Sequence, residues 1–185
     1  FTPRSPAKRD EVGPYAGTFH SLCAKILRKD GKHIGVSPSF IIYDGQDQLD
    51  LVKSVMKTLD ISTKNLPAGR HGFNPGAILH TISEAKSELI SALEYPQYAR
   101  GYFQETVSQV YLEYQKTLRE NEALDFDDLL MRTVELFRKE PRVLEKWAGR
   151  FKYVLVDEYQ DVNTSQYVLT KMLASLHGNL TAVGD

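Results

Sequence analysis

The sequence of 185 residues contains a single cysteine, Cys23, and nowhere spaces histidine and cysteine as metal ligands are spaced. A disulfide within the chain and a structural zinc site are therefore excluded, which favours a reducing compartment. No apolar run approaches the roughly 20 residues that a membrane helix needs. The first residues do not resemble a secretory leader, so we expect a soluble, cytoplasmic protein without a membrane partner.

The sequence also has no excess of charge of one sign, because it contains 23 Lys and Arg and 24 Asp and Glu, for a net charge of -1. Without an overall basic field, any nucleic-acid partner must be bound by a local patch. A content of 42% hydrophobic and 25% charged residues is typical of a globular chain with one or two domains. The chain starts without methionine and ends just after an apolar run, which we expect of a segment from a longer protein.

Amphipathic helices dominate the middle of the sequence, because apolar residues recur every three or four positions with charged residues between them. Each apolar stripe needs another helix to cover it, which predicts a helical region over 22–148. Asp44 and the pair Asn74-Pro75 are expected to start two of the helices. The stripes are Val52, Val55, Met56 and Leu59; Ile78, Ile82, Ala85, Leu89 and Leu93; Val107, Val110, Tyr111, Tyr114 and Leu118; and Phe126, Leu129, Leu130, Val134 and Phe137.

The C-terminal part follows a different pattern. Two short aliphatic runs, 153–156 and 180–183, flank a helical stripe made of Val168, Met172, Leu173 and Leu176. Strand, helix and strand at this spacing predict a βαβ unit whose parallel strands are covered on both faces. A weaker strand is expected at 16–19. The predicted fold class is mainly α with a small parallel α/β part, which the chain leaves after residue 21 and re-enters over 149–185.

Two adjacent acids, Asp157 and Glu158, directly follow the first aliphatic run. A buried parallel strand that ends in two carboxylates places them in the crevice where α/β sheets bind ligands. There Asp157 could hold Mg²⁺ through its water shell, and Glu158 could orient or deprotonate a water that attacks a γ-phosphate. The alternative is that the pair caps the helix that starts near 162–164. The four apolar residues before the pair and the βαβ pattern after it favour the catalytic interpretation.

Five segments carry a resemblance to a known family. Asp157-Glu158-Tyr159-Gln160-Asp161 resembles the Walker B motif, motif II, of the superfamily 1 DNA helicases of the UvrD/Rep/PcrA type. Gly17-Thr-Phe-His-Ser21 resembles motif Ib of that family, and Ala182-Val-Gly-Asp185 resembles the opening of motif III. Residues 77–90 are similar to a helix of its 1B subdomain. Ala123-Leu-Asp-Phe-Asp-Asp-Leu-Leu130 is similar to the signature near the end of that subdomain.

The resemblance implies a piece of an ATP-dependent DNA helicase that couples hydrolysis of Mg-ATP to movement along single-stranded DNA, from 3′ to 5′. Catalytic roles are implied for Asp157, Glu158 and Gln160. Contacts to the nucleotide are implied for Asp157, Glu158 and Asp185, with magnesium held by Asp157 through water. On this resemblance residues 1–21 and 149–185 belong to an incomplete sheet of the P-loop NTPase type, the 1A motor domain, and 22–148 form a 1B-like insertion.

The resemblance to motif Ib implies contacts with nucleic acid from Thr18, Phe19, His20 and Ser21, although the ring of Phe19 fits core packing as well. The implied partners are single-stranded DNA, junctions of single and double strands, and the rest of the motor domains. The implied setting is DNA repair in a bacterial cytoplasm, associated with the nucleoid. The acids at 125, 127 and 128 are expected to cap a helix rather than to contact phosphates, which would repel them.

The sequence departs from the family where the phosphates would bind. The pattern G-x-x-x-x-G-K-[S/T] is absent, since the one Gly-Lys pair, Gly31-Lys32, is followed by His33 and lacks the earlier glycine. Without that loop, no row of backbone N–H groups surrounds the phosphates, so we expect the chain alone to be inactive. Residues 1–16 fit the family pattern poorly.

Two other interpretations stay open at this point. The first is a non-enzymatic module that binds DNA or docks a partner through its helices, with the acids purely structural. The second is a two-metal nuclease built from Asp125, Asp127, Asp157 and Glu158, whose acids would have to converge around paired ions. The loop at 64–76 holds Lys64, Arg70 and His71, and we interpret it as an exposed connection rather than as a phosphate contact.

Overall fold

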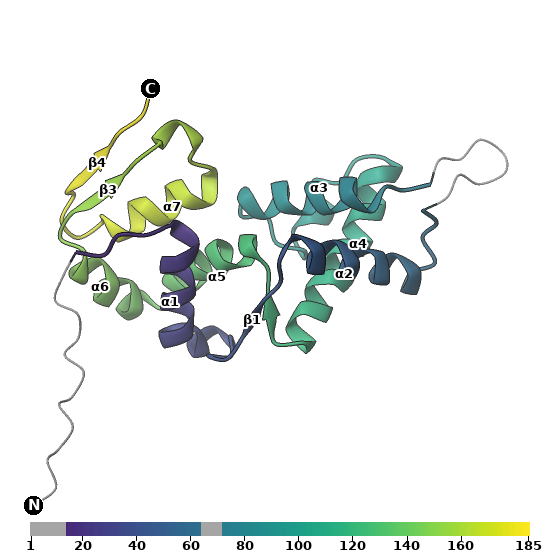
Figure 1. Ribbon diagram of the computed structural model, residues 1–185, viewed down its shortest axis with the longest axis horizontal. Coiled ribbons are helices and arrows are strands. Elements are labelled where there is room, and N and C mark those ends of the chain that lie inside the picture. Colours follow the sequence, from purple (N-terminus) through teal and green to yellow (C-terminus); the bar gives the residue numbers. More distant parts are fainter. Residues whose placement is uncertain (1–13, 64–71) are drawn as a thin grey trace, which may run out of the picture.

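The computed structural model describes residues 14–63 and 72–185 (Figure 1). The segment before residue 14 and the predicted contacts of Lys64, Arg70 and His71 lie outside the described residues. In chain order the elements are α1 (Phe19–Asp30), η1 (Gly31–Ile34), β1 (Ile41–Ile42), α2 (Gly45–Thr58), α3 (Pro75–Ser87), η2 (Tyr95–Gln97), α4 (Tyr102–Glu120), β2 (Ala123–Leu124), α5 (Phe126–Lys139), α6 (Pro141–Arg150), β3 (Val154–Val156), η3 (Tyr159–Asp161), α7 (Thr164–Leu173) and β4 (Leu180–Ala182).

The fold is mainly helical, and over the described ranges it has two small parallel sheets of two strands each, as the sequence predicted. Two lobes lie side by side in Figure 1: α2, α3 and α4 form one, and α1, α5, α6 and α7 form the other with β3 and β4. Each lobe has its own hydrophobic core. The core of the lobe with α1, α5, α6 and α7 includes Trp147, Phe137 and Leu169. The core of the lobe with α2, α3 and α4, which we call the inserted helices, includes Tyr114, Ile82 and Val52.

The predicted helix starts are confirmed. The carboxylate of Asp44 accepts hydrogen bonds from the N–H groups of Gln46 and Asp47 at the start of α2. Asn74 accepts from Gly76 at the start of α3, with Pro75 in the first turn. Such caps satisfy N–H groups that the helix itself leaves without partners, which is why they can be recognised from local sequence.

The predicted end of one helix is wrong. The stripe through Ile82 and Ala85 was expected to continue to Leu89 and Leu93, but α3 ends at Ser87. Leu89 then takes a left-handed backbone conformation with φ 60°, and the side chain of Leu93 is 81% exposed. The helix stops because the chain turns there, so apolar spacing beyond the turn no longer marks a buried face.

The βαβ unit is confirmed at the C-terminus. β3 and β4 pair in parallel, with Leu155 opposite Thr181, and α7 connects them. The expectation that both faces are covered is wrong for the described part of the chain, since Leu155 is 75% exposed and Val183 57% exposed. Figure 1 shows the reason: the sheet lies at the outer edge of its lobe, with α7 packed on one side of it only.

A second correction concerns residues 16–19, which form no strand. The chain is extended there, and α1 begins at Phe19 with the hydroxyl of Thr18 as its cap. Two strands that the sequence did not predict, β1 and β2, pair with each other in parallel between the two lobes. Among the described helices, none has the length and apolar character needed to cross a membrane.

Candidate functional site

The acidic pair Asp157 and Glu158 lies at the carboxyl end of β3. Val156 is in register with Ala182 of the neighbouring strand, so Asp157 lies beside Val183 at the same edge of the sheet. The N–H of Val183 donates to the carbonyl of Val156 at 2.9 Å, which holds the two strand ends together. Both acids are exposed at this edge.

The end of β4 approaches the same backbone closely. The N–H of Tyr159 donates to the carbonyl of Val183 at 2.9 Å. A Cβ at Gly184 would collide with Oε1 of Gln160 and would lie 3.2 Å from the N atom of Tyr159. A larger residue at 184 would therefore have to move the side chain of Gln160 and shift the nearby backbone, and the exposed Asp185 follows directly.

Glu158 occupies a strained position. Its backbone is left-handed, with φ 51° and ψ 46°, a conformation that costs a residue with a side chain about 1 to 3 kcal/mol. Two local hydrogen bonds accompany it: the N–H of Glu158 donates to Oδ1 of Asp157 at 3.0 Å, and Nε2 of Gln160 donates to Oε2 of Glu158 at 2.6 Å. The three residues with implied catalytic roles are thus brought together, and the amide of Gln160 orients the carboxylate of Glu158.

Within residues 14–63 and 72–185, neither Asp157 nor Glu158 takes part in an ion pair. The helix that follows them is capped by Asn163, whose Oδ1 accepts from the N–H of Gln166 at 3.0 Å, with the side chain of Gln166 bonded back to the N–H of Asn163. The interpretation of the acids as a helix cap is therefore wrong. Each carboxylate is exposed and uses one oxygen in a local hydrogen bond, Oδ1 in Asp157 and Oε2 in Glu158.

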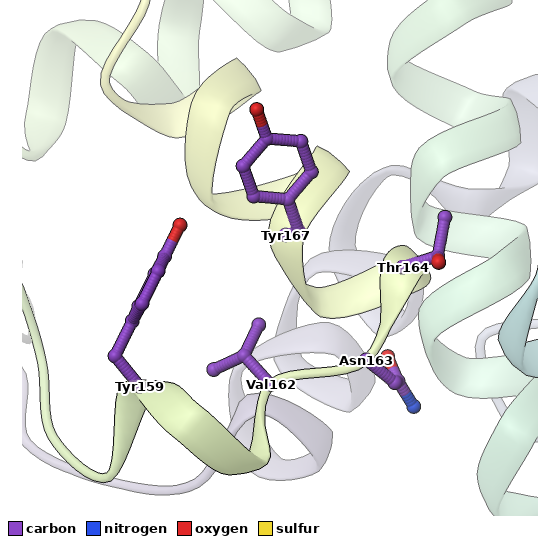
Figure 2. A pocket seen from close by; sticks show the side chains of 5 residues that line it. All are labelled: Tyr159, Val162, Asn163, Thr164 and Tyr167. Atoms are coloured by element: carbon purple, nitrogen blue, oxygen red, sulfur yellow. The ribbon is translucent and has the colours of Figure 1, made fainter. Parts of the chain in front are cut away.

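A surface pocket of about 200 Å³ adjoins this segment at the start of α7. Figure 2 shows the rings of Tyr159 and Tyr167 on one side of it and the side chains of Asn163 and Thr164 on the other, with Val162 between them. The pocket opens beside the acids rather than around them.

The segment that resembles motif Ib is built around the start of α1. Oγ1 of Thr18 accepts from the N–H of Ser21 at 3.2 Å, and the Ser21 hydroxyl donates to the Thr18 carbonyl at 2.8 Å. The hydroxyl of Tyr15 lies 2.7 Å from that of Ser21. Phe19 packs against the core of its lobe, as the alternative interpretation of its ring expected. Thr18 and Ser21 thus have structural bonds already, and their remaining exposed surface is what a phosphate could contact.

One exposed aromatic residue beside this segment was not predicted from the sequence. The ring of Phe126 was assigned to an apolar stripe, but it is 44% exposed at the first position of α5. It meets the ring of His20 edge to face, with ring centroids 5.7 Å apart. Its exposure could have been predicted from its position among three acids at a helix start, because the first residue of a helix often lies outside the core.

A buried charge cluster joins the inserted helices to the other lobe. Nζ of Lys86, at the end of α3, lies 2.6 Å from Oδ2 of Asp125 and 2.9 Å from Oδ1 of Asp128, and the Lys86 side chain is 0% exposed. Tyr114 donates its hydroxyl proton to Asp125 at 2.8 Å, and Gln115 donates to both oxygens of Asp128 at 3.1 Å. The charged groups of the cluster are each hydrogen-bonded, as a buried ion pair requires, whereas the buried Oε1 of Gln115 has no hydrogen-bond partner among the described residues.

Burial and charge act against each other in this cluster. Burial alone would lower the pKa of the Lys86 ammonium, but the adjacent carboxylates of Asp125 and Asp128 outweigh it, so the pKa is raised. Burial raises the pKa of the Asp128 carboxyl, and the charge of Asp125 adds to that rise. Burial likewise raises the pKa of Asp127, which accepts a hydrogen bond from Ser83 at 2.7 Å.

The geometry contradicts the two-metal nuclease. Asp125 faces Lys86 and caps α5 through the N–H of Asp128, as the sequence predicted for these acids, so it is not available to a metal. Over the described residues, no three His, Cys, Asp or Glu side chains are grouped so that they could hold a metal ion. The acids of α5 and the acids after β3 therefore serve separate sites.

Comparison with known proteins gives the family. A family model described as UvrD/REP helicase N-terminal domain matches residues 8–185, and the chain belongs to this family. Over 171 residues the chain is 46% identical to the ATP-dependent DNA helicase PcrA of Bacillus subtilis and 43% identical to that of Staphylococcus aureus. These matches cover 92% of the chain but 22% of each relative, so the chain spans about a fifth of the length of the curated relatives it matches.

Proposed function

We propose that the chain forms part of a motor that hydrolyses ATP and uses the energy to move along single-stranded DNA, from 3′ to 5′. The observation that carries this proposal is the pair Asp157 and Glu158, exposed at the carboxyl edge of a parallel sheet and without an ion-pair partner among the described residues. Membership of the UvrD/REP family supports it, and relatives with 46% and 43% identity are named ATP-dependent DNA helicases.

The residues at the sheet edge fit Mg-ATP. Asp157 and Glu158 offer carboxylate oxygens, the ligands that Mg²⁺ prefers, and Oδ1 of Asp157 accepts from the adjacent N–H of Glu158. When bound through water to Asp157, Mg²⁺ would neutralise charge on the β- and γ-phosphates. Glu158 would orient the attacking water and accept its proton. Gln160 would hold that carboxylate in place through its 2.6 Å hydrogen bond. Asp185, which follows β4, would contact the bound nucleotide.

The start of α1 supplies the surface for DNA. Thr18, His20 and Ser21 carry hydroxyl and imidazole groups that can donate to phosphates. The exposed ring of Phe126, next to His20, can stack on an unpaired base, whereas Phe19 supports this surface from the core. Single strands and their junctions with duplex are the partners that such a surface fits.

The proposed division of the chain does not coincide with the division between the two cores. Residues 1–21 and 149–185 would belong to the 1A motor domain, and 22–148 would carry the 1B-like insertion; within that range α1 and α5 pack with the motor part. The phosphate loop and the second motor domain would come from polypeptide outside these 185 residues, which is why we expect the chain alone to be inactive. We place the whole protein in DNA repair in the bacterial cytoplasm, close to the nucleoid.

The test compares this chain with a longer polypeptide that includes a glycine-rich phosphate loop and both motor domains. The longer polypeptide should hydrolyse ATP in the presence of single-stranded DNA, and Glu158→Gln should lower kcat by about a hundredfold or more, the loss expected for a general base. Glu145→Gln, an exposed change on α6, is the control and should have no effect.

Two results would contradict the proposal. One is unchanged ATP hydrolysis in Glu158→Gln. The other is salt-dependent binding of single strands without any ATP hydrolysis by the longer polypeptide, which would favour a non-enzymatic DNA-binding module instead.

A further inference from the structure

We infer that the end of α3 positions the acidic segment 157–161 by holding the first residues of α7, with Glu88 and Thr164 as the central pair. This inference rests on the proposed function, because it assigns a positioning role for ATP hydrolysis to residues of the inserted helices. Neither residue lies in the segments that carry the resemblance to helicase motifs II, Ib and III.

The contact has two donors, the Thr164 hydroxyl, whose single proton is shared between two oxygens, and the Asn163 amide; their acceptors lie 76 residues earlier in the chain. The hydroxyl of Thr164 lies 3.0 Å and 2.9 Å from the two carboxylate oxygens of Glu88, to which it donates. Nδ2 of Asn163 donates to the hydroxyl of Ser87 at 3.3 Å. The Glu88 carboxylate also lies at the N-terminus of α7, where the helix dipole favours negative charge.

The end of α3 is itself firmly held, so it can serve as a fixed point. Lys86 is buried against Asp125 and Asp128, and Ser83 donates to Asp127 at 2.7 Å. Leu89 follows in a left-handed conformation, φ 60°, that leucine rarely adopts, and its side chain packs against the core of the other lobe. Ser83, Lys86 and Leu89 thus each attach the end of α3 to the lobe that carries Asp157 and Glu158.

The start of α7 is close to those acids along the chain. η3 and Val162 are all that separates Glu158 from Asn163. Glu158 is strained, and Gln160 within η3 holds its carboxylate. A strained residue keeps its conformation only when its surroundings fix it, and the fixed start of α7 supplies one end of that restraint. Loss of the Glu88 contact should therefore displace Gln160 and Glu158 without unfolding either lobe.

The experiment uses the longer polypeptide with both motor domains and measures ATP hydrolysis with single-stranded DNA. Glu88→Ala and Thr164→Val should each lower kcat by roughly three- to tenfold, a loss of the size of one typical net hydrogen bond, with the KM for ATP unchanged within about twofold. The double variant should lose no more than either single variant, since both remove the same contact. Thr164→Ser, which keeps the hydroxyl, should restore kcat.

Glu84→Ala is the matched control, because Glu84 is an exposed acid one turn earlier on α3 and its partner is His80. It should leave kcat unchanged. The positioning role is wrong if Glu88→Ala and Thr164→Val keep the kcat of the unmodified protein, or if they lower only the melting temperature. Those results, together with loss of hydrolysis in Glu158→Gln, would leave the proposed function intact. An unmodified protein that hydrolyses no ATP would instead overturn both.

Discussion

Replacement of Lys86 by methionine should destabilise the chain strongly at neutral pH. The methionine fills a similar volume, but the buried carboxylates of Asp125 and Asp128 lose the ammonium that lies 2.6 Å and 2.9 Å from them. Removal of one partner of a buried pair costs about 3 to 5 kcal/mol, because the remaining charge stays desolvated. For a chain of this size that loss corresponds to a fall in Tm of roughly 10 °C or more.

The loss should depend on pH in a defined direction. The raised pKa of Asp128 means that the folded chain keeps this proton at pH values where the unfolded chain has released it. Its contribution to stability is complete below the ordinary pKa of 3.8 and is lost as the pH rises through the raised value. Without Lys86 the pKa rises further. The variant should therefore recover part of its stability as the pH falls from about 7 towards about 4, relative to the unmodified chain.

Urea unfolding followed by circular dichroism at several pH values measures this effect. Lys139→Met is the control, because Lys139 is 64% exposed in its pair with Glu135, and it should change the unfolding midpoint little at any pH. A cost below about 1 kcal/mol for Lys86→Met at pH 7, or a cost that does not shrink at lower pH, would refute the assignment of Lys86 as the counter-ion of these acids.

Three further predictions concern single positions. Thr18→Ala should lower stability by about 1 kcal/mol through loss of the α1 cap, and Thr18→Ser should restore most of it in thermal unfolding. Gly184→Ala should lower ATP hydrolysis in the longer polypeptide, because its Cβ would displace Oε1 of Gln160 and would lie 3.2 Å and 3.3 Å from the N atoms of Tyr159 and Gln160; normal hydrolysis would contradict the close approach. Leu155→Lys should leave the Tm of this chain unchanged in thermal unfolding, since Leu155 is 75% exposed on an uncovered sheet; a clear fall in Tm would show that this side chain is packed.

Local patterns predicted local structure well. The caps at Asp44 and Asn74 were found because the side chain and the N–H groups it bonds are neighbours in sequence. The βαβ unit was found because aliphatic runs and turn residues mark its strands. The strand expected at 16–19 failed because the same residues end in a helix cap at Thr18, and an extended approach to a helix has the dihedral angles of a strand.

Features that depend on distant partners were not predictable. A lysine such as Lys86 would ordinarily be solvated, and its burial depends on Asp125, 39 residues later, and on Asp128. The contact of Glu88 with Thr164 crosses 76 residues. For the site, the sequence indicated the acids and their strand, whereas the left-handed backbone of Glu158 follows from the closeness of β4, which no local pattern records.

The pairing of β1 with β2 has a consequence for how such chains can change in length. Ile41 is in register with Ala123, so the polypeptide enters the inserted helices and comes back at neighbouring positions, and paired strands lie about 4.8 Å apart. Everything between these crossings could be exchanged for a short linker, or enlarged, without stretching the rest of the chain. A trimmed version would, however, uncover Asp125 and Asp128, so a lineage that discarded the insertion would be expected to replace both acids as well.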